Sequence, residues 1–391
     1  MALFLWLDFI ILRCFFEKNR FMKIGKKAAF LFGICFMGAA LQAQDSFGFT
    51  TVAEVETSSV KSQDRTGTCW AYSTMSFVES EIMRMGGPEM DLSEMYIVKY
   101  AYQNKAQRYV LLHGMGNFSQ GGQAHDVMNV IAEHGFVRET DYFGRPDTSK
   151  MHNHYEMEST IKVMLDNYID RDDASPSAVW YTNVESILTN YLGEVPGDLK
   201  YNKRTYTPTK FAAGLGIDKL NYVELTSYTH HPFYEQFDLE VPDNWSHDRY
   251  YNVPIDELIN TMKEALAKGY SIVWDGDVSD SFFSHKNGVA LLPVDEELGF
   301  VQQTEKEVTQ SDRQEAFYSW KATDDHLMHI TGVVKDKNGT VYFKTKNSWG
   351  SKKNPYSGYL YMSEAYVRMN TVAIMLHKHG VDKELQKKLF K

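Results

Sequence analysis

Cysteine is scarce in this sequence, with only Cys14, Cys35 and Cys69 among 391 residues. The first two lie in an N-terminal segment with the features of a targeting signal, so the mature chain is predicted to keep a single thiol. One thiol excludes an intramolecular disulfide, and with it the small disulfide-stabilised scaffolds. Any chemistry at Cys69 is therefore that of a free thiol.

Excess positive charge and long apolar runs are also missing. The formal net charge is −10, which argues against a nucleic-acid backbone or an anionic membrane as the main partner. The apolar run at residues 28–41 is shorter than the roughly 20 residues of a membrane span. With 43% hydrophobic and 14% aromatic residues, the chain can bury a sizeable core, and its length fits one large or two ordinary globular domains.

The N-terminus resembles a bacterial secretory signal from about Met22 to Ala43. Basic residues at 23–27 precede the apolar run, and Ala43 offers a small residue for cleavage. We expect an exported protein, periplasmic or secreted, with no stable membrane anchor after cleavage. Residues 1–21 are interpreted as upstream sequence ahead of the true initiator Met22; the alternative is a two-span anchor.

Cys69 is predicted to begin a helix. The apolar residues that follow it recur at three-to-four spacing and end near Gly86 and Gly87; they are Ala71, Met75, Val78 and Ile82. In the first turn, free N–H groups and the positive end of the helix dipole favour an anion. We therefore expect the pKa of the Cys69 thiol to lie well below its usual value of about 8.5, which makes it a candidate nucleophile.

Gln63, six residues before Cys69, is a candidate oxyanion donor. Its side-chain amide and the backbone N–H of Cys69 would form a two-donor hole for a tetrahedral intermediate. The alternative is that Cys69 is a buried structural cysteine. The spacing Gln-x5-Cys-Trp resembles the active-site signature of papain-like cysteine peptidases, and this resemblance favours the nucleophile.

Hydrophobic periodicity divides the rest of the chain into two halves. A mainly helical lobe, 44–250, would carry the nucleophile, and a mainly antiparallel β lobe, 251–391, would carry the base, with the site in the cleft between them. Residues 1–43 fall outside both lobes. The expected helices are 123–134, 156–169, 178–191 and 255–268, and the expected strands are 270–274, 326–334, 341–348, 358–362 and 372–376.

A thiol nucleophile needs an imidazole, and the segment DDHLMHI offers His326 and His329. Three positions apart on a strand, the two rings point to opposite faces, and the pattern alone does not choose between them. The resemblance aligns His326 with the catalytic histidine and leaves His329 as a core residue. It also implies that Asn347, in KNSWG, orients the ring of His326, with Trp349 shielding their hydrogen bond.

Within the papain-like peptidases, the sequence most resembles the bleomycin hydrolase and bacterial aminopeptidase C branch over roughly residues 45–380. The segments that carry this resemblance include GGQAHDVMNVIAEHGFV and GYLYMS. It implies an α+β, papain-like two-lobed fold and hydrolysis of peptide bonds through an acyl thioester, as an aminopeptidase on short peptides. It also implies that Gly121 and Gly122 bind an extended substrate beside Trp349, without metal or cofactor, and it is compatible with a homo-oligomer.

Two features depart from that branch, which is typically cytoplasmic. One is the export signal; the other is the ending KELQKKLFK, where the family's C-terminal arm continues into the cleft. An endopeptidase, an acyl transferase with the same Cys-His pair, and a catalytically silent peptide-binding protein stay open as alternatives. Four histidines are expected to be solvated loop residues, because their spacing does not match a zinc site; they are His152, His154, His230 and His231.

Overall fold

The computed structural model describes residues 47–170 and 177–390. The predicted signal segment and its cleavage position after Ala43 lie outside the described residues. Within the described part, no helix combines the length and the apolar character that crossing a membrane requires.

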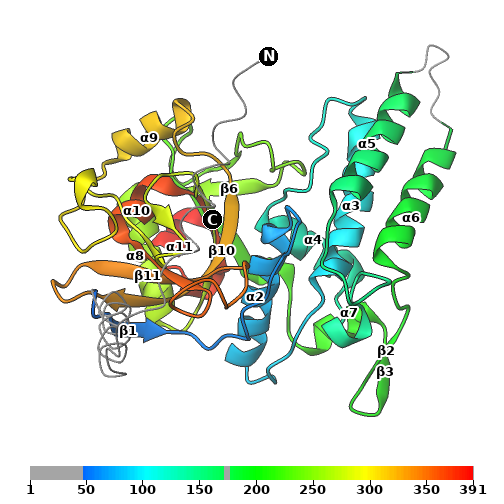
Figure 1. Cartoon of the computed structure of the whole chain (residues 1–391), viewed down its shortest axis with the longest axis horizontal. Coiled ribbons are helices and arrows are strands. Elements are labelled where there is room, and N and C mark those ends of the chain that lie inside the picture. The colour runs from blue at the N-terminus through cyan, green and yellow to red at the C-terminus, as the bar shows by residue number, and fades with distance from the viewer. Residues whose placement is uncertain (1–46, 171–176, 391) are drawn as a thin grey trace, which may run out of the picture. The chain divides into compact units, whose positions relative to one another are not determined.

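Strand β10 (His326–Lys335) lies at the centre of a large sheet (Figure 1). It pairs antiparallel with β11 on one side and with β7 and β1 on the other. The order is β5-β6-β4-β13-β7-β10-β11-β12-β9-β8, and only the β4–β6 and β12–β9 pairs among the described residues are parallel. The other strands are β1 (Thr50–Glu54), β4 (Tyr222–Thr226), β5 (Gln236–Asp238), β6 (Arg249–Asn252), β7 (Ile272–Gly276), β8 (Phe283–Ser284), β9 (Val289–Ala290), β11 (Val341–Lys346), β12 (Tyr359–Ser363) and β13 (Thr371–His377).

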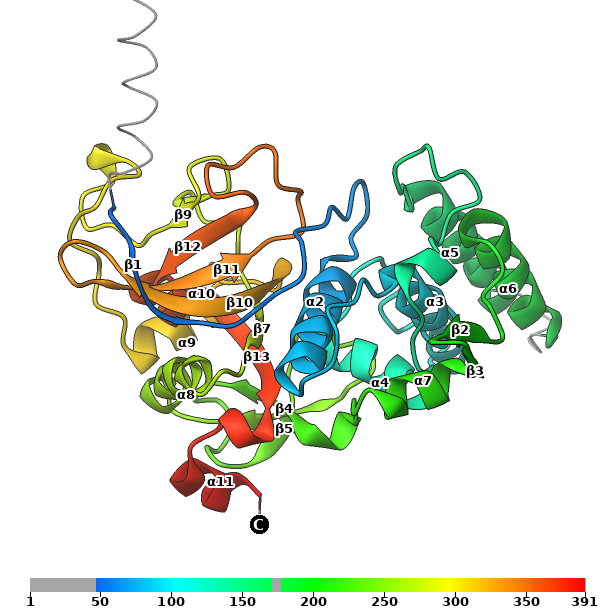
Figure 2. The same cartoon turned by 90° about the horizontal axis from the view of Figure 1, so that it is seen from below.

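Helices form a second lobe beside this sheet (Figure 2). A small hairpin of β2 (Leu199–Tyr201) and β3 (Arg204–Tyr206) accompanies them. The helices of this lobe are α2 (Cys69–Arg84), α3 (Glu94–Leu111), α4 (Ala124–His134), α5 (Tyr155–Ile169), α6 (Val179–Leu192) and α7 (Pro208–Gly214). Those of the sheet lobe are α8 (Ile255–Ala267), α9 (Gln310–Tyr318), α10 (Glu364–Asn370) and α11 (Lys383–Leu389).

Helix α2 lies at the junction of the two lobes. All of its residues from Cys69 to Ile82 are buried, and it packs against β10, where the Ser76 hydroxyl lies 2.9 Å from Nδ1 of His329. The predicted apolar stripe is therefore only part of what this helix buries. A helix enclosed on all sides holds its first residue in a fixed position.

Buried polar contacts fix α2 against the neighbouring segments. Lys61 contacts Glu79 at 3.0 Å and Glu94 at 2.7 Å, which joins the segment before α2 to α2 and α3. From β11, the Lys346 ammonium donates to the Ser76 hydroxyl at 2.8 Å. Buried charges that lose a partner cost about 3–5 kcal/mol, so these contacts resist sliding of the lobes.

The predicted lobe boundary near residue 250 does not separate helices from strands. Strand β1, near the N-terminus of the described chain, pairs with β10, and β4, β5 and β6 all precede residue 253 yet belong to the large sheet. These strands have only three to five residues each, and pairing with partners distant in the sequence is what makes them join the sheet.

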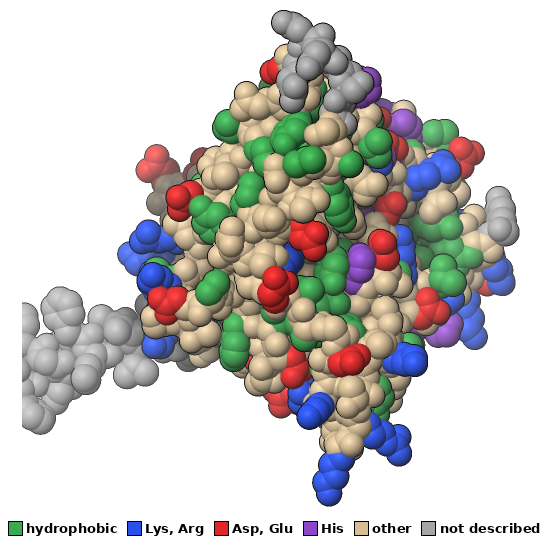
Figure 3. All heavy atoms as spheres, turned by 90° about the vertical axis from the view of Figure 1, so that its right-hand side faces the viewer, with side chains coloured by type: hydrophobic (Ala, Val, Ile, Leu, Met, Phe, Trp, Pro, Cys, Tyr) green, Lys and Arg blue, Asp and Glu red, His purple; other side chains and the backbone are tan. Residues whose placement is uncertain are grey.

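The face of the molecule that carries α5 and α6 exposes apolar side chains among charged ones (Figure 3). Tyr155 is 66% exposed, Val163 60% and Val179 54%. On the sheet lobe, α11 packs beside α8, where the Lys388 ammonium contacts Glu257 at 3.0 Å. The described end of the chain therefore covers the sheet lobe.

Candidate active site

Cys69 is the first residue of α2 and is a free cysteine with 8% of its surface exposed. The backbone N–H of Leu327 lies close enough to its sulfur to lower the pKa of the thiol. Leu327 directly follows His326 at the start of β10, so the sulfur lies against the strand that carries the predicted base. The structure thus brings together residues 257 positions apart in the sequence.

The side chain of Asn347 fixes the proton position on His326. Oδ1 of Asn347 accepts the backbone N–H of Ser348 at 2.7 Å, so this oxygen is also the atom that faces Nε2 of His326 at 2.9 Å. The imidazole must donate there, and its proton resides on Nε2. Nδ1 keeps its lone pair and can accept a proton from a nucleophile.

Trp349 packs beside this hydrogen bond, as expected from the sequence. Its ring centroid lies 4.8 Å from that of His326, and the side chain is 39% exposed. On the other side, Nδ2 of Asn347 lies 3.2 Å from Nδ1 of His285. His326 itself is 4% exposed, so its hydrogen bond to Asn347 is protected from water.

Gln63 is held by a network of hydrogen bonds. The Ser348 hydroxyl donates to Oε1 of Gln63 at 2.6 Å, and Nε2 of Gln63 donates to the carbonyl of Thr66 at 2.7 Å. A side-chain amide nitrogen carries two N–H groups, so one N–H remains for a ligand. The backbone N–H of Cys69, in the first turn of α2, is the other predicted donor.

The expected low pKa of the Cys69 thiol is wrong. Burial raises its pKa to about 12, and the negative charges of three nearby aspartates add to this effect, while the Leu327 N–H opposes it; the aspartates are Asp243, Asp324 and Asp275. Burial also lowers the pKa of His326 to about 4. The free site therefore holds a neutral thiol and a neutral imidazole.

The loop with Gly121 and Gly122 is fastened to the start of α2. The indole N–H of Trp70 donates to the carbonyl of Gln120 at 2.9 Å, and a side chain at Gly122 would lie 3.0 Å from the same indole ring. The carbonyl of Gly121 accepts from the Lys105 ammonium and is already engaged. A carbonyl oxygen has two lone pairs, so a substrate strand added along this loop would share that carbonyl with Lys105.

Comparisons with known proteins agree with this geometry. A family model described as "Peptidase C1-like family" matches residues 195–391, just over half of the chain, and one described as "Papain family cysteine protease" matches residues 44–190. The chain belongs to the peptidase C1-like family. It is a papain-type cysteine peptidase of the aminopeptidase C branch, with the α+β fold expected from its sequence.

Curated relatives are similar over most of their length. "Aminopeptidase C" of Listeria innocua is 23% identical over 374 residues, covering 85% of this chain and 83% of the relative. "Aminopeptidase G" of Lactobacillus delbrueckii subsp. lactis is 21% identical over 385 residues, covering 86% and 84%. The crystal structure of PepW from Lactobacillus rhamnosis HN001 has the same fold, with a TM-score of 0.70 at 20% identity, covering 94% of this chain and 92% of that one.

His329 occupies the core of this peptidase, as the family resemblance implied. It is fully buried, and its Nδ1 lies 2.9 Å from the Ser76 hydroxyl. Burial, with the nearby charge of Lys346, holds its pKa well below the usual range. A neutral, hydrogen-bonded ring between α2 and β10 has a structural role.

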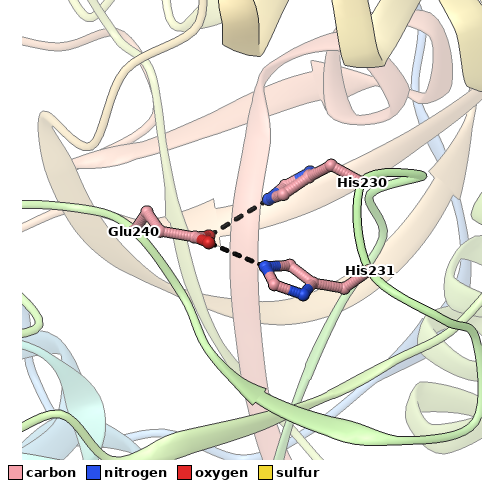
Figure 4. A group of neighbouring side chains, drawn as sticks. All are labelled: His230, His231 and Glu240. Carbon is pink, nitrogen blue, oxygen red and sulfur yellow. Dashed lines mark hydrogen bonds and ion pairs between the residues drawn. The ribbon is translucent and has the colours of Figure 1, made fainter.

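His230 and His231 share the carboxylate of Glu240 (Figure 4). Their Nε2 atoms lie 3.1 and 2.7 Å from its oxygens, a grouping close enough to surround a metal ion. However, Oε1 of Gln314 accepts from the backbone N–H of Thr229, which turns the Gln314 amide N–H toward Nδ1 of His230 at 3.2 Å. A metal-bound histidine donates from its second nitrogen, and this one accepts there. We therefore interpret the cluster as hydrogen-bonded, with Nε2–H of His230 donating to Glu240.

The other two histidines expected to be solvated are buried. His152 is 6% exposed and His154 is 2% exposed, and burial lowers their pKa values to about 4 and about 3. They lie just before α5, with ring centroids 5.9 Å apart. The prediction of solvated loop residues is wrong here, because the polar sequence around them does not reveal that the loop packs into the helical lobe.

Two residues that position the site were not predicted. Ser348 orients Gln63 through its hydroxyl and Asn347 through its backbone N–H. His285 contacts the Asn347 amide from a loop more than 60 positions away. Ser348 lies within the motif KNSWG, so the motif was a usable signal; nothing in the sequence around His285 marked it.

Proposed function

We propose that this peptidase is an exported aminopeptidase that removes residues from the free amino end of short peptides. One observation carries the chemistry: the sulfur of Cys69 contacts the same strand end on which Asn347 fixes the His326 tautomer. The relatives that are named aminopeptidases support the choice of amino-terminal residues.

In the proposed mechanism, Cys69 is the nucleophile. Nδ1 of His326 accepts the thiol proton while the sulfur attacks the substrate carbonyl, which forms a C–S bond and an oxyanion. The free N–H of Gln63 and the backbone N–H of Cys69 stabilise that oxyanion. The imidazolium, held by Asn347, then gives its proton to the leaving amine and leaves an acyl thioester. Water, activated by His326, hydrolyses the thioester.

Paired substrates test this function. An aminoacyl anilide with a free α-amino group and its Nα-acetylated counterpart are compared at equal concentrations. We expect the free-amine substrate to have the larger kcat/KM. Equal values would identify an endopeptidase. Products carrying an added amine in place of water would identify an acyl transferase, and tight binding without turnover a silent peptide-binding protein.

The pH dependence of Cys69 alkylation by iodoacetamide tests the role of His326. Its lowered pKa keeps the ring neutral, and able to accept the thiol proton, down to about pH 4. The alkylation rate is therefore expected to fall as the pH falls through about 4. This acid limb should persist in Asp324→Asn and disappear in His326→Ala. An acid limb near pH 4 that persists in His326→Ala would contradict the assignment to this imidazole.

Export is proposed from the sequence between Met22 and Ala43. Expression of the full gene in a bacterial host should give a mature chain that begins at Gln44, outside the cytoplasm. Intact mass and cell fractionation measure both properties. A chain that keeps residues 22–43 and stays in the cytoplasm would refute the export proposal and leave the peptidase chemistry unaffected.

A further inference from the structure

Three aspartates from separate segments act on the Cys69 sulfur. Asp243 precedes β6, Asp275 is in β7 and Asp324 is two residues before β10. Asp275 pairs across the sheet with Leu327, the residue whose N–H contacts the sulfur. The negative charges of all three raise the pKa of the thiol, so each carboxylate is near enough for its charge to act on the sulfur.

Asp275 is buried against Asp324, with Gln123 nearby. It is 3% exposed, and neither of its carboxylate oxygens has a hydrogen-bond donor among the described residues. Burial, followed by the charge of Asp324, holds its pKa well above the usual range. Buried polar atoms are nearly always hydrogen bonded, and an unfilled acceptor costs about 1–3 kcal/mol. Asp275 is therefore protonated and neutral beside Asp324, and its unfilled acceptor oxygen indicates a ligand that donates.

Asp324 and Asp243 provide access to this cluster. Both residues are only partly buried, although burial of the Asp324 carboxyl raises its pKa to about 7. Oδ2 of Asp324 accepts from Nε2 of Gln123 at 2.8 Å, which anchors it to the start of α4. Nδ2 of Asn117 donates a hydrogen bond to Oδ1 of Asp243 at 2.9 Å.

Gly121 lets the carboxylate of Asp243 approach the substrate loop. A Cβ atom at this glycine would lie 1.7 Å from Oδ2 of Asp243, so any other residue would displace the carboxylate. This explains why glycine is needed at position 121. The loop expected to bind substrate and the acidic cluster are therefore parts of one site.

The cationic groups near the cluster are already engaged. The Lys105 ammonium donates to the carbonyls of Ser119 and Gly121. Nδ1 of His125 lies 2.8 Å from the carboxylate of Glu224. Neither cation forms an ion pair with the three aspartates, and because the raised pKa of Asp275 keeps that residue neutral, the negative charge of the cluster resides on Asp243 and Asp324.

We propose that Asp243 and Asp324, backed by Asp275, bind the α-ammonium group of the substrate and so select its free amino end. This inference rests on the proposed aminopeptidase function and names the residues that would give it that specificity. An ammonium group offers three N–H donors and one positive charge, and charge-assisted hydrogen bonds to carboxylates are the strong ones. A bound ammonium also offsets the negative charge that disfavours the Cys69 thiolate.

The test measures kcat/KM on the free-amine and Nα-acetylated anilides for the mature protein and three variants. Asp243→Asn and Asp324→Asn are expected to lose about 10- to 100-fold on the free-amine substrate, with little change on the acetylated one. Asp325→Asn is the matched control. It removes the same charge one residue away, where the carboxylate is exposed and contacts the Thr323 hydroxyl at 2.7 Å. The control is expected to keep the wild-type preference.

Alkylation of Cys69 shows whether each variant keeps its nucleophile. Removing a negative charge beside the sulfur favours the thiolate, so Asp243→Asn and Asp324→Asn should react with iodoacetamide at least as fast as the wild type. An equal loss on both substrates, or a preference that survives in both variants, would overturn the inference and leave the aminopeptidase function standing. A wild-type protein that hydrolyses neither substrate would overturn both.

Discussion

Replacing Cys69 with alanine is expected to lower kcat/KM by about 10⁴-fold or more, because removal of a covalent nucleophile eliminates the acyl-enzyme route. Cys69 is the only cysteine among the described residues, so no neighbouring thiol can substitute for it. Steady-state hydrolysis of the free-amine anilide measures the effect.

A matched control for this change is Ser73→Ala, one turn further along α2. Its hydroxyl donates to the carbonyl of Trp70 within the same helix, so its loss leaves the chemistry intact. The nucleophile assignment would be contradicted if Cys69→Ala kept more than a tenth of the wild-type activity, or if Ser73→Ala lost as much.

Alanine substitutions of the two histidines of β10 are expected to have different effects, one on catalysis and the other on stability. His326→Ala removes the base and should lower kcat/KM by about 10²- to 10⁴-fold, with slower alkylation of Cys69 and only a small change in Tm. His329→Ala should keep the reactivity of the thiol, but it leaves a cavity in the core and removes the acceptor of the Ser76 O–H, which then keeps only its contact with Lys346. We expect it to lower the free energy of unfolding by about 2–4 kcal/mol.

Thermal unfolding and alkylation kinetics, measured on the same two preparations, decide between the histidines. The assignment of roles requires the slow alkylation in His326→Ala and the lower Tm in His329→Ala. The reverse pattern, with the thiol unreactive only in His329→Ala, would make His329 the base and contradict the geometry at Asn347.

Local sequence patterns predicted the longer amphipathic helices, whereas the short helices α7, α9, α10 and α11 were not predicted. The spacing of apolar residues placed α2, α4 and α8. These features depend on neighbours within one or two turns. The short strands β1 and β4 to β6 were missed because their pairing depends on partners far away in the sequence.

The sequence predicted which residues form the site, but it did not predict the pKa of the Cys69 thiol. The motifs around Cys69, His326 and Asn347 identified residues that the structure brings together. The helix-terminus argument for a low thiol pKa failed because burial and carboxylates from three distant segments act on the same sulfur. The pair DD before His326 was visible in the sequence, but only the fold shows that Asp324 meets Asp243 and Asp275.

The thioester between the substrate and Cys69 can be observed directly. Acid quenching during turnover of an aminoacyl ester, followed by intact-mass and peptide analysis, is the most direct test. The proposed mechanism predicts a mass increase equal to one aminoacyl group, located on the peptide that contains Cys69 and absent from Cys69→Ala. Sustained hydrolysis without any adduct, or an adduct on another residue, would contradict it.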